Sequence, residues 1–300
     1  MRNTLLLIGV AGILFCHSCS TCSRQQPVDD LIDLGDWFVD SAHVEMARKV
    51  LYALPTPIEL SFLIREAGIP WNSDLLNDPA RASSYLTSQK MALNFGVYFT
   101  NMAYAGLFEQ TQTVWLYKFA LNNLIERMGL QAAININTMQ QLEENIHDRE
   151  MLLRTISGIY ADCSAFLDEN ERYSMTLAVL AGGWVECMHI ATSMLDENLL
   201  ANEDRIKQLV TDQILTFDIM WQAMSDLRES PGVEDLMNSF SGLAQLFDRI
   251  GIHQEPNTVS IFDDEDVSEI SSTNALIVTP KDFENIKIQI QILRDNFTNN

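Results

Sequence analysis

The stretch Met175-Thr-Leu-Ala-Val-Leu-Ala-Gly-Gly-Trp-Val185 contains no charged side chain and decides the fold of this 300-residue chain. A helix of this composition is apolar on all its faces, so other helices have to cover it on several sides. We therefore predict a central, buried helix over residues 171–195.

A second stretch, Ala92-Leu-Asn-Phe-Gly-Val-Tyr98, resembles the first at an offset of 86 residues. Ala92, Gly96, Tyr98 and Ala105 correspond to Ala178, Gly182, Trp184 and Ala191. Glycine permits close approach of two backbones, so both stretches suit tightly packed helices. Two explanations stay open: the chain consists of two related halves, or two buried helices meet the same packing demand.

The remainder of the chain is also helical in pattern. Apolar residues recur every three or four positions from about residue 28 onward, including one long stretch over residues 138–167. Thr279 as N-cap and Pro280 at the first helical position predict the start of a C-terminal helix. We predict an all-α fold, an antiparallel helical bundle or array of about eight helices, in a single domain over residues 28–300. An acidic loop is expected at residues 255–274, because six acidic and no basic residues lie between Glu255 and Glu269.

The N-terminus has the pattern of an export signal. Arg2 precedes an apolar run from Leu5 to Phe15, which as a helix would span about 16 Å, against about 30 Å for a bilayer core. Such a run is too short to cross a membrane and is typical of a signal peptide. We assign residues 1–18 to a signal peptide and residues 19–27 to a tether.

The signal ends in small residues directly before a cysteine, which resembles the signal of bacterial lipoproteins. Cys19 is the best candidate for lipidation, because Ser18 before it is small whereas Phe15 before Cys16 is bulky. We expect an exported protein, anchored by lipid in the cell envelope and facing the periplasm or the cell surface.

The net charge of −22, from 41 acidic and 19 basic residues, argues against several partners. Nucleic acid binding needs a basic surface, so we expect no nucleic acid partner. Anionic lipid headgroups would be repelled as well, so we expect membrane contact through the lipid anchor only.

The cysteines Cys163 and Cys187 are expected to be buried free thiols. They fall on two helices joined by a turn near Glu169, and their distances from that turn differ by about 18 Å along the helix axes. A disulfide needs Cα atoms within about 7 Å.

Three stretches carry a resemblance: Pro55-Thr-Pro-Ile-Glu59, Ala92–Tyr98 and Leu180-Ala-Gly-Gly-Trp-Val-Glu186. In these the chain resembles uncharacterised exported helical proteins and lipoproteins of Bacteroidetes-type bacteria. The resemblance implies an all-α envelope protein and brings no activity with it.

A repeated Glu-x-x-His pattern is the sharpest candidate for chemistry. Glu144 with His147, and Glu186 with His189, each share one helical face, as in the di-iron sites of four-helix bundles. The apolar stripes of both helices, however, place these four side chains on the outward faces, which favours two ordinary surface pairs. A metal-binding protein or metal-dependent enzyme that uses these residues is the alternative function.

The leading hypothesis is non-enzymatic. The aromatic residues lie at core spacing, and no polar constellation is placed to do chemistry, so we expect no catalytic residues and no cofactor. We predict an interaction, scaffold or ligand-binding module whose partner is an envelope protein or a small ligand.

Overall fold

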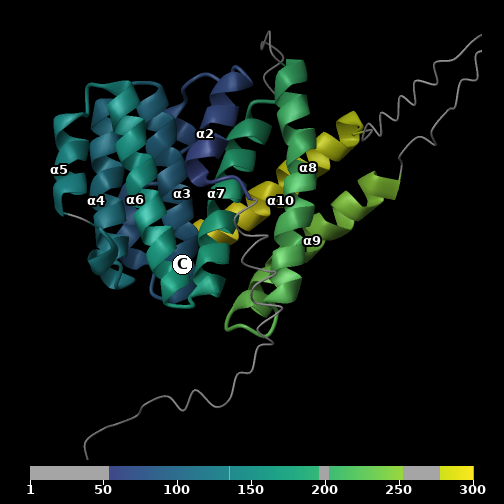
Figure 1. Cartoon of the computed structure of the whole chain (residues 1–300). Helices are drawn as coiled ribbons and strands as arrows, with labels where there is room; N and C mark the ends of the chain where they lie inside the picture. The colour runs from purple at the N-terminus through teal and green to yellow at the C-terminus, as the bar shows by residue number, and fades with distance from the viewer. Residues whose placement is uncertain (1–53, 135, 196–202, 253–277, 300) are drawn as a thin grey trace, which may run out of the picture. The chain divides into compact units, whose positions relative to one another are not determined.

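The computed structural model describes residues 54–134, 136–195, 203–252 and 278–299, which all belong to the compact unit Val39–Asn300 (Figure 1). These residues form nine α-helices and three short 3-10 helices, with no strand among them. The all-α prediction is therefore confirmed for the described part of the chain. The α-helices are α2 (Pro57–Glu66), α3 (Ser88–Leu107), α4 (Thr111–Arg127), α5 (Ile136–Glu144), α6 (Arg149–Glu169), α7 (Tyr173–Ser193), α8 (Glu203–Asp226), α9 (Val233–Ile252) and α10 (Pro280–Thr298).

The predicted start of the C-terminal helix is confirmed. The Thr279 hydroxyl accepts a hydrogen bond from the backbone N–H of Asp282, and the Asp282 carboxylate accepts one in return from the backbone N–H of Thr279. This reciprocal pair satisfies two backbone donors that a helix start leaves open. The predicted acidic loop at residues 255–274 and the N-terminal segments 1–18 and 19–27 lie outside the described residues.

The recurrence of apolar residues over residues 138–167 indicates one continuous helix, and this interpretation is wrong. The chain leaves the helix after Glu144 and starts α6 at Arg149. Asp148 causes the new start, because its carboxylate accepts a hydrogen bond from the backbone N–H of Met151 in the first turn of α6.

Helix α7 is the central helix, as predicted. It packs against α2, α3, α6, α8 and α10, and every residue from Leu177 to Thr192 is buried. By length and composition α7 is also the one described helix that could cross a membrane, but 89% of its most apolar window is buried inside the protein. Its apolar character is thus accounted for by the core.

Helices α3 and α7 approach each other through their glycines. A Cβ atom placed on Gly96 would lie 1.9 Å from the carbonyl oxygen of Val179, and one on Gly182 would lie 1.9 Å from that of Leu93. The two contacts are equivalent under the 86-residue offset, which relates Gly96 to Gly182 and Leu93 to Val179. The shared sequence pattern therefore corresponds to one reciprocal helix crossing.

We expect Gly96→Ala and Gly182→Ala each to lower the free energy of unfolding by about 3 kcal/mol, since a methyl group there meets backbone atoms that cannot rotate away. Gly158→Ala on α6 is the matched control. A Cβ there meets nothing within 4 Å, so replacing a helical glycine should stabilise by about 0.5–1 kcal/mol. Denaturant unfolding measures all three variants, and equal stability of Gly96→Ala and Gly158→Ala would contradict the assignment.

Candidate functional site

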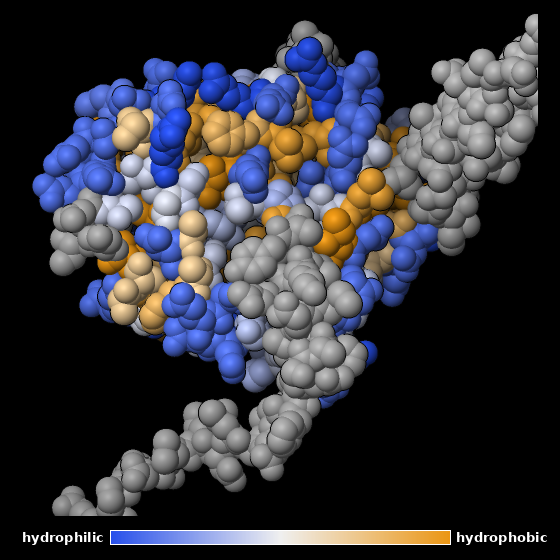
Figure 2. Space-filling model, in the orientation of Figure 1, coloured by the Kyte–Doolittle hydropathy of each residue, from blue (hydrophilic) through white to orange (hydrophobic). Residues whose placement is uncertain are grey.

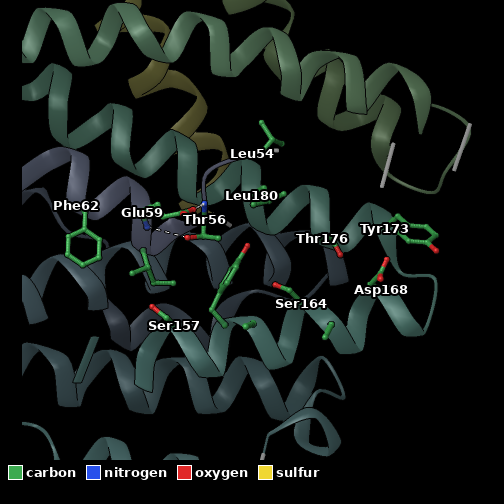
Figure 3. Close-up of a pocket in the computed structure, with 14 residues that line it drawn as sticks. Leu54, Thr56, Glu59, Phe62, Ser157, Ser164, Asp168, Tyr173, Thr176 and Leu180 are labelled. Atoms are coloured by element: carbon green, nitrogen blue, oxygen red, sulfur yellow. Dashed lines mark hydrogen bonds between the residues drawn. The ribbon is translucent and has the colours of Figure 1, made fainter. Parts of the chain in front are cut away.

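A pocket of about 420 Å³ lies between the N-terminal half of α2, the face of α6 and the first turns of α7 (Figure 3). Its described lining is mainly apolar and includes several hydroxyl groups. The lining residues are Leu54, Thr56, Ile58, Glu59, Phe62, Ser157, Tyr160, Ala161, Ser164, Ala165, Asp168, Tyr173, Thr176 and Leu180. The volume falls within the range of about 300–1,000 Å³ that is usual for small-molecule sites.

Small side chains on α6 create the space. Ser157, Ala161, Ser164 and Ala165 recur at helical spacing on the face of α6 that lines the pocket. On α7, Thr176 and Leu180 lie one turn apart and line the same pocket. Large residues at the α6 positions would close the gap between the two helices.

A capping box fixes the α2 wall. The Thr56 hydroxyl accepts a hydrogen bond of 3.2 Å from the Glu59 backbone N–H, and the Glu59 carboxylate accepts one of 2.7 Å from the Thr56 backbone N–H. Pro57 occupies the first helical position, where its missing N–H costs nothing. The sequence Pro55-Thr-Pro-Ile-Glu59 carries the signature of a capping box and could have identified this wall.

The hydroxyl groups of Tyr160 and Thr176 differ in their hydrogen bonding. Burial raises the pKa of Tyr160, and a hydrogen bond with Ser164 opposes that shift, so the phenol is neutral at pH 7. The Thr176 hydroxyl oxygen is buried and has no hydrogen-bond partner. An unpaired buried hydroxyl lowers the stability of the fold, because it has lost its hydrogen bonds to water without gaining others.

A second polar centre lies between α7 and α10, away from the pocket lining. Arg294 donates from Nε to Glu186 at 2.7 Å and from a terminal nitrogen to the other carboxylate oxygen at 3.2 Å. The same terminal nitrogen donates to the Leu75 carbonyl at 2.9 Å. Burial alone would lower the pKa of Arg294, but the Glu186 carboxylate outweighs it and the pKa is raised. The ion pair joins the C-terminal helix to the core.

His189 lies next to this ion pair and is 7% exposed. Burial lowers its pKa from the ordinary value of 6.5 to about 4; Glu186 opposes this shift and Arg294 adds to it. The imidazole is therefore neutral at pH 7.

Of the four residues in the metal hypothesis, two are exposed and two are buried. Glu144 ends α5 and His147 lies in the following turn, both exposed as the sequence indicates. Glu186 and His189 are buried, so their prediction as an outward surface pair is wrong: α7 is covered on the side that the apolar stripe leaves open, by α10. Among the described residues, no group of three or more His, Cys, Asp or Glu is placed to hold a metal ion. Glu186 is also already bound by Arg294.

The cysteine predictions divide in the same way. Cys163 and Cys187 are buried free thiols, as predicted, and burial raises the pKa of each to about 12. Both are therefore protonated at pH 7 and poor nucleophiles. Cys19, the predicted lipidation site, lies outside the described residues.

The visible face of the molecule carries polar residues with apolar ones between them, including an apolar area between the positions labelled α2 and α8 in Figure 1 (Figure 2). The large apolar side chains exposed on these two helices are Phe62, Leu215 and Ile219. Phe62 also lines the pocket.

In comparisons with known proteins, no family model, no curated protein and no solved structure matches the chain. The resemblance to exported helical proteins of Bacteroidetes-type bacteria stays a prediction.

We expect acid to destabilise the protein through His189. The unfolded chain takes up this proton near pH 6.5 and the folded protein only near pH 4, so stability is full above pH 6.5 and falls as the pH drops toward 4. The loss over that interval is about 3 kcal/mol. Urea unfolding between pH 7 and pH 4.5 should show a shallower decline for His189→Gln than for the wild type. His147→Gln, at an exposed position, is the control and should follow the wild type.

Proposed function

We propose that this protein is an exported, lipid-anchored and non-enzymatic binding protein of the cell envelope, and that the pocket between α2, α6 and α7 holds a small, mainly apolar ligand. The pocket is the observation that carries the proposal. It is of ligand size, its walls are mostly apolar, and the lining includes a few polar side chains, such as those of Ser157 and Ser164. A few polar groups in an apolar cavity are typical of small-molecule sites.

The lining supports binding rather than catalysis. A serine becomes a nucleophile when a base lies within hydrogen-bond reach. Ser157 and Ser164 line the pocket, and its described lining contains no His, Lys or Cys. Its two carboxylates are Asp168 and Glu59, of which Glu59 already accepts a hydrogen bond from the Thr56 backbone. Tyr160 is a neutral phenol with a raised pKa, so it is no base at pH 7.

The N-terminal sequence supports the location. The apolar run from Leu5 to Phe15 followed by Cys19 fits a lipoprotein signal. A protein of net charge −22 gains no attraction from anionic lipids, so its hold on the membrane would come from acyl chains. An envelope protein as the partner, in place of a small ligand, stays a prediction from the sequence.

The pocket is tested with N-phenyl-naphthylamine, a neutral dye whose fluorescence rises in apolar surroundings. We expect saturable binding at one site, and at least a tenfold loss of affinity in Ala161→Trp. Ala161 is an exposed residue of the lining, so the indole fills the pocket without disturbing the core. Met151→Trp, exposed on α6 outside the lining, is the matched control and should bind like the wild type. Absence of saturable binding, or equal loss in both variants, would refute the ligand site.

The anchor is tested by growing a bacterial host that expresses the full chain on an alkyne-labelled fatty acid. We expect label in the protein and recovery in the membrane fraction. Cys19→Ala should lose both, whereas Cys16→Ala should keep both. Label that persists in Cys19→Ala would disprove Cys19 as the modified residue.

A further inference from the structure

The charges around the pocket are of one sign. Glu59 and Asp168 line it, and the described lining contains no Arg, Lys or His. In Figure 3, Glu59 lies with Phe62 and Thr56 at one end of the drawn group, and Asp168 lies with Tyr173 and Thr176 at the other. A ligand that fills the pocket would therefore lie with the Glu59 carboxylate near one of its ends and the Asp168 carboxylate near the other.

Glu59 is held in place by a backbone hydrogen bond. One of its carboxylate oxygens accepts the hydrogen bond from the Thr56 backbone, which fixes the side chain against the start of α2. The described ion pairs include no partner for Glu59. A fixed carboxylate can bind a charged ligand without first losing side-chain entropy.

The Glu59 carboxylate acts electrostatically on Tyr160, a residue of the pocket lining. Burial is the main cause of the raised pKa of Tyr160, and the Glu59 carboxylate raises this pKa further. Tyr160 is buried and lines the pocket, so the field of Glu59 extends to the surface that a ligand would touch. An anion at that surface would be disfavoured in the same way as the phenolate.

The remaining surface suits an apolar body. Leu54, Ile58 and Leu180 supply aliphatic contact, and the rings of Phe62 and Tyr160 supply aromatic contact. Aromatic rings also attract cations through their faces. The apolar and the electrostatic features of the lining therefore favour the same class of ligand.

We propose that the pocket selects apolar ligands that carry a positively charged group, such as an ammonium, and rejects anionic ligands of the same shape. This inference rests on the proposed ligand-binding function and names its ligand class. It follows from the lining itself: a cavity of ligand size, mainly apolar walls, two carboxylates, and no basic side chain among the described lining residues.

Three probes of one shape test the inference: naphthylmethylammonium, naphthylmethanol and naphthoate, as competitors of N-phenyl-naphthylamine on the purified protein at near-physiological salt. We expect the cation to bind about tenfold more tightly than the neutral alcohol, and the alcohol more tightly than the carboxylate. Equal affinity of the three probes would overturn the inference and leave the ligand-binding function standing. Failure of the parent dye to bind would refute the function itself.

A charge variant distinguishes the effect of the two pocket carboxylates from that of the negative charge of the whole protein. In Glu59→Gln with Asp168→Asn, the preference for the cation should fall to within about twofold, while the affinity for the alcohol is kept. Glutamine at residue 59 can still accept from the Thr56 backbone, so the cap of α2 remains. Glu126→Gln with Asp162→Asn removes two exposed charges outside the lining and is the control, which should keep the wild-type preference. A preference that survives in the first variant, or that disappears in the control, would overturn the inference.

Discussion

The crossing of α3 with α7 is the constraint on which the rest of the structure depends. Gly96 and Gly182 bring the two backbones so close that any side chain at either position would overlap a carbonyl group of the other helix. Both helices are buried without interruption, from Met91 to Leu107 and from Leu177 to Thr192. Two helices that are covered on every side need a shell of other helices around them, and α2, α4, α6, α8 and α10 supply it. The fold is therefore a shell of helices packed around the α3–α7 pair.

The uninterrupted burial of α7 from Leu177 to Thr192 has an electrostatic consequence. A helix that has no outward face must satisfy each of its polar side chains inside the protein, because an unpaired buried charge costs several kcal/mol. Glu186 is 0% exposed, and Arg294 reaches it from α10. The end of α10 is held further by Lys90, which donates to the carbonyl of Asn299 at 2.6 Å, and by Asn94, which donates to that of Phe297 at 2.8 Å. The C-terminal helix is thus bound to α3 and α7 by polar contacts as well as by its apolar side.

The sequence predicts the helices well and the site poorly, for identifiable reasons. Helix starts at Thr279 and ends such as Gly129, which adopts a φ of +70°, depend on neighbouring residues and can be found by local rules. The burial of Glu186 and His189 depends on α10, which is about 100 residues away in sequence, and an apolar stripe assigns only one inner face to a helix. The helix is interrupted before α6 because Asp148 caps a new helix start. Apolar residues recur at helical spacing on both sides of Asp148, so the sequence pattern alone does not reveal the interruption. The pocket exists because α6 has small side chains where it faces α2 and α7, namely those of Ser157, Ala161, Ser164 and Ala165. The sequence does not mark these positions as a pocket, because the facing helices have to be known first.

The position of the pocket follows from where the burial of α7 begins. Its first turn, from Tyr173 to Thr176, is only partly covered, and the uninterrupted burial starts at Leu177. The three helices that form the walls, α2, α6 and α7, all pack on α3, so the tight crossing fixes the walls before any ligand arrives. A pre-formed cavity loses little entropy on binding, and affinity then depends on how well the ligand matches the walls in shape and charge. The cavity itself carries two carboxylates, Glu59 and Asp168, beside mainly apolar walls. Two carboxylates beside apolar walls therefore fit the proposed ligand class, apolar molecules that carry a positively charged group.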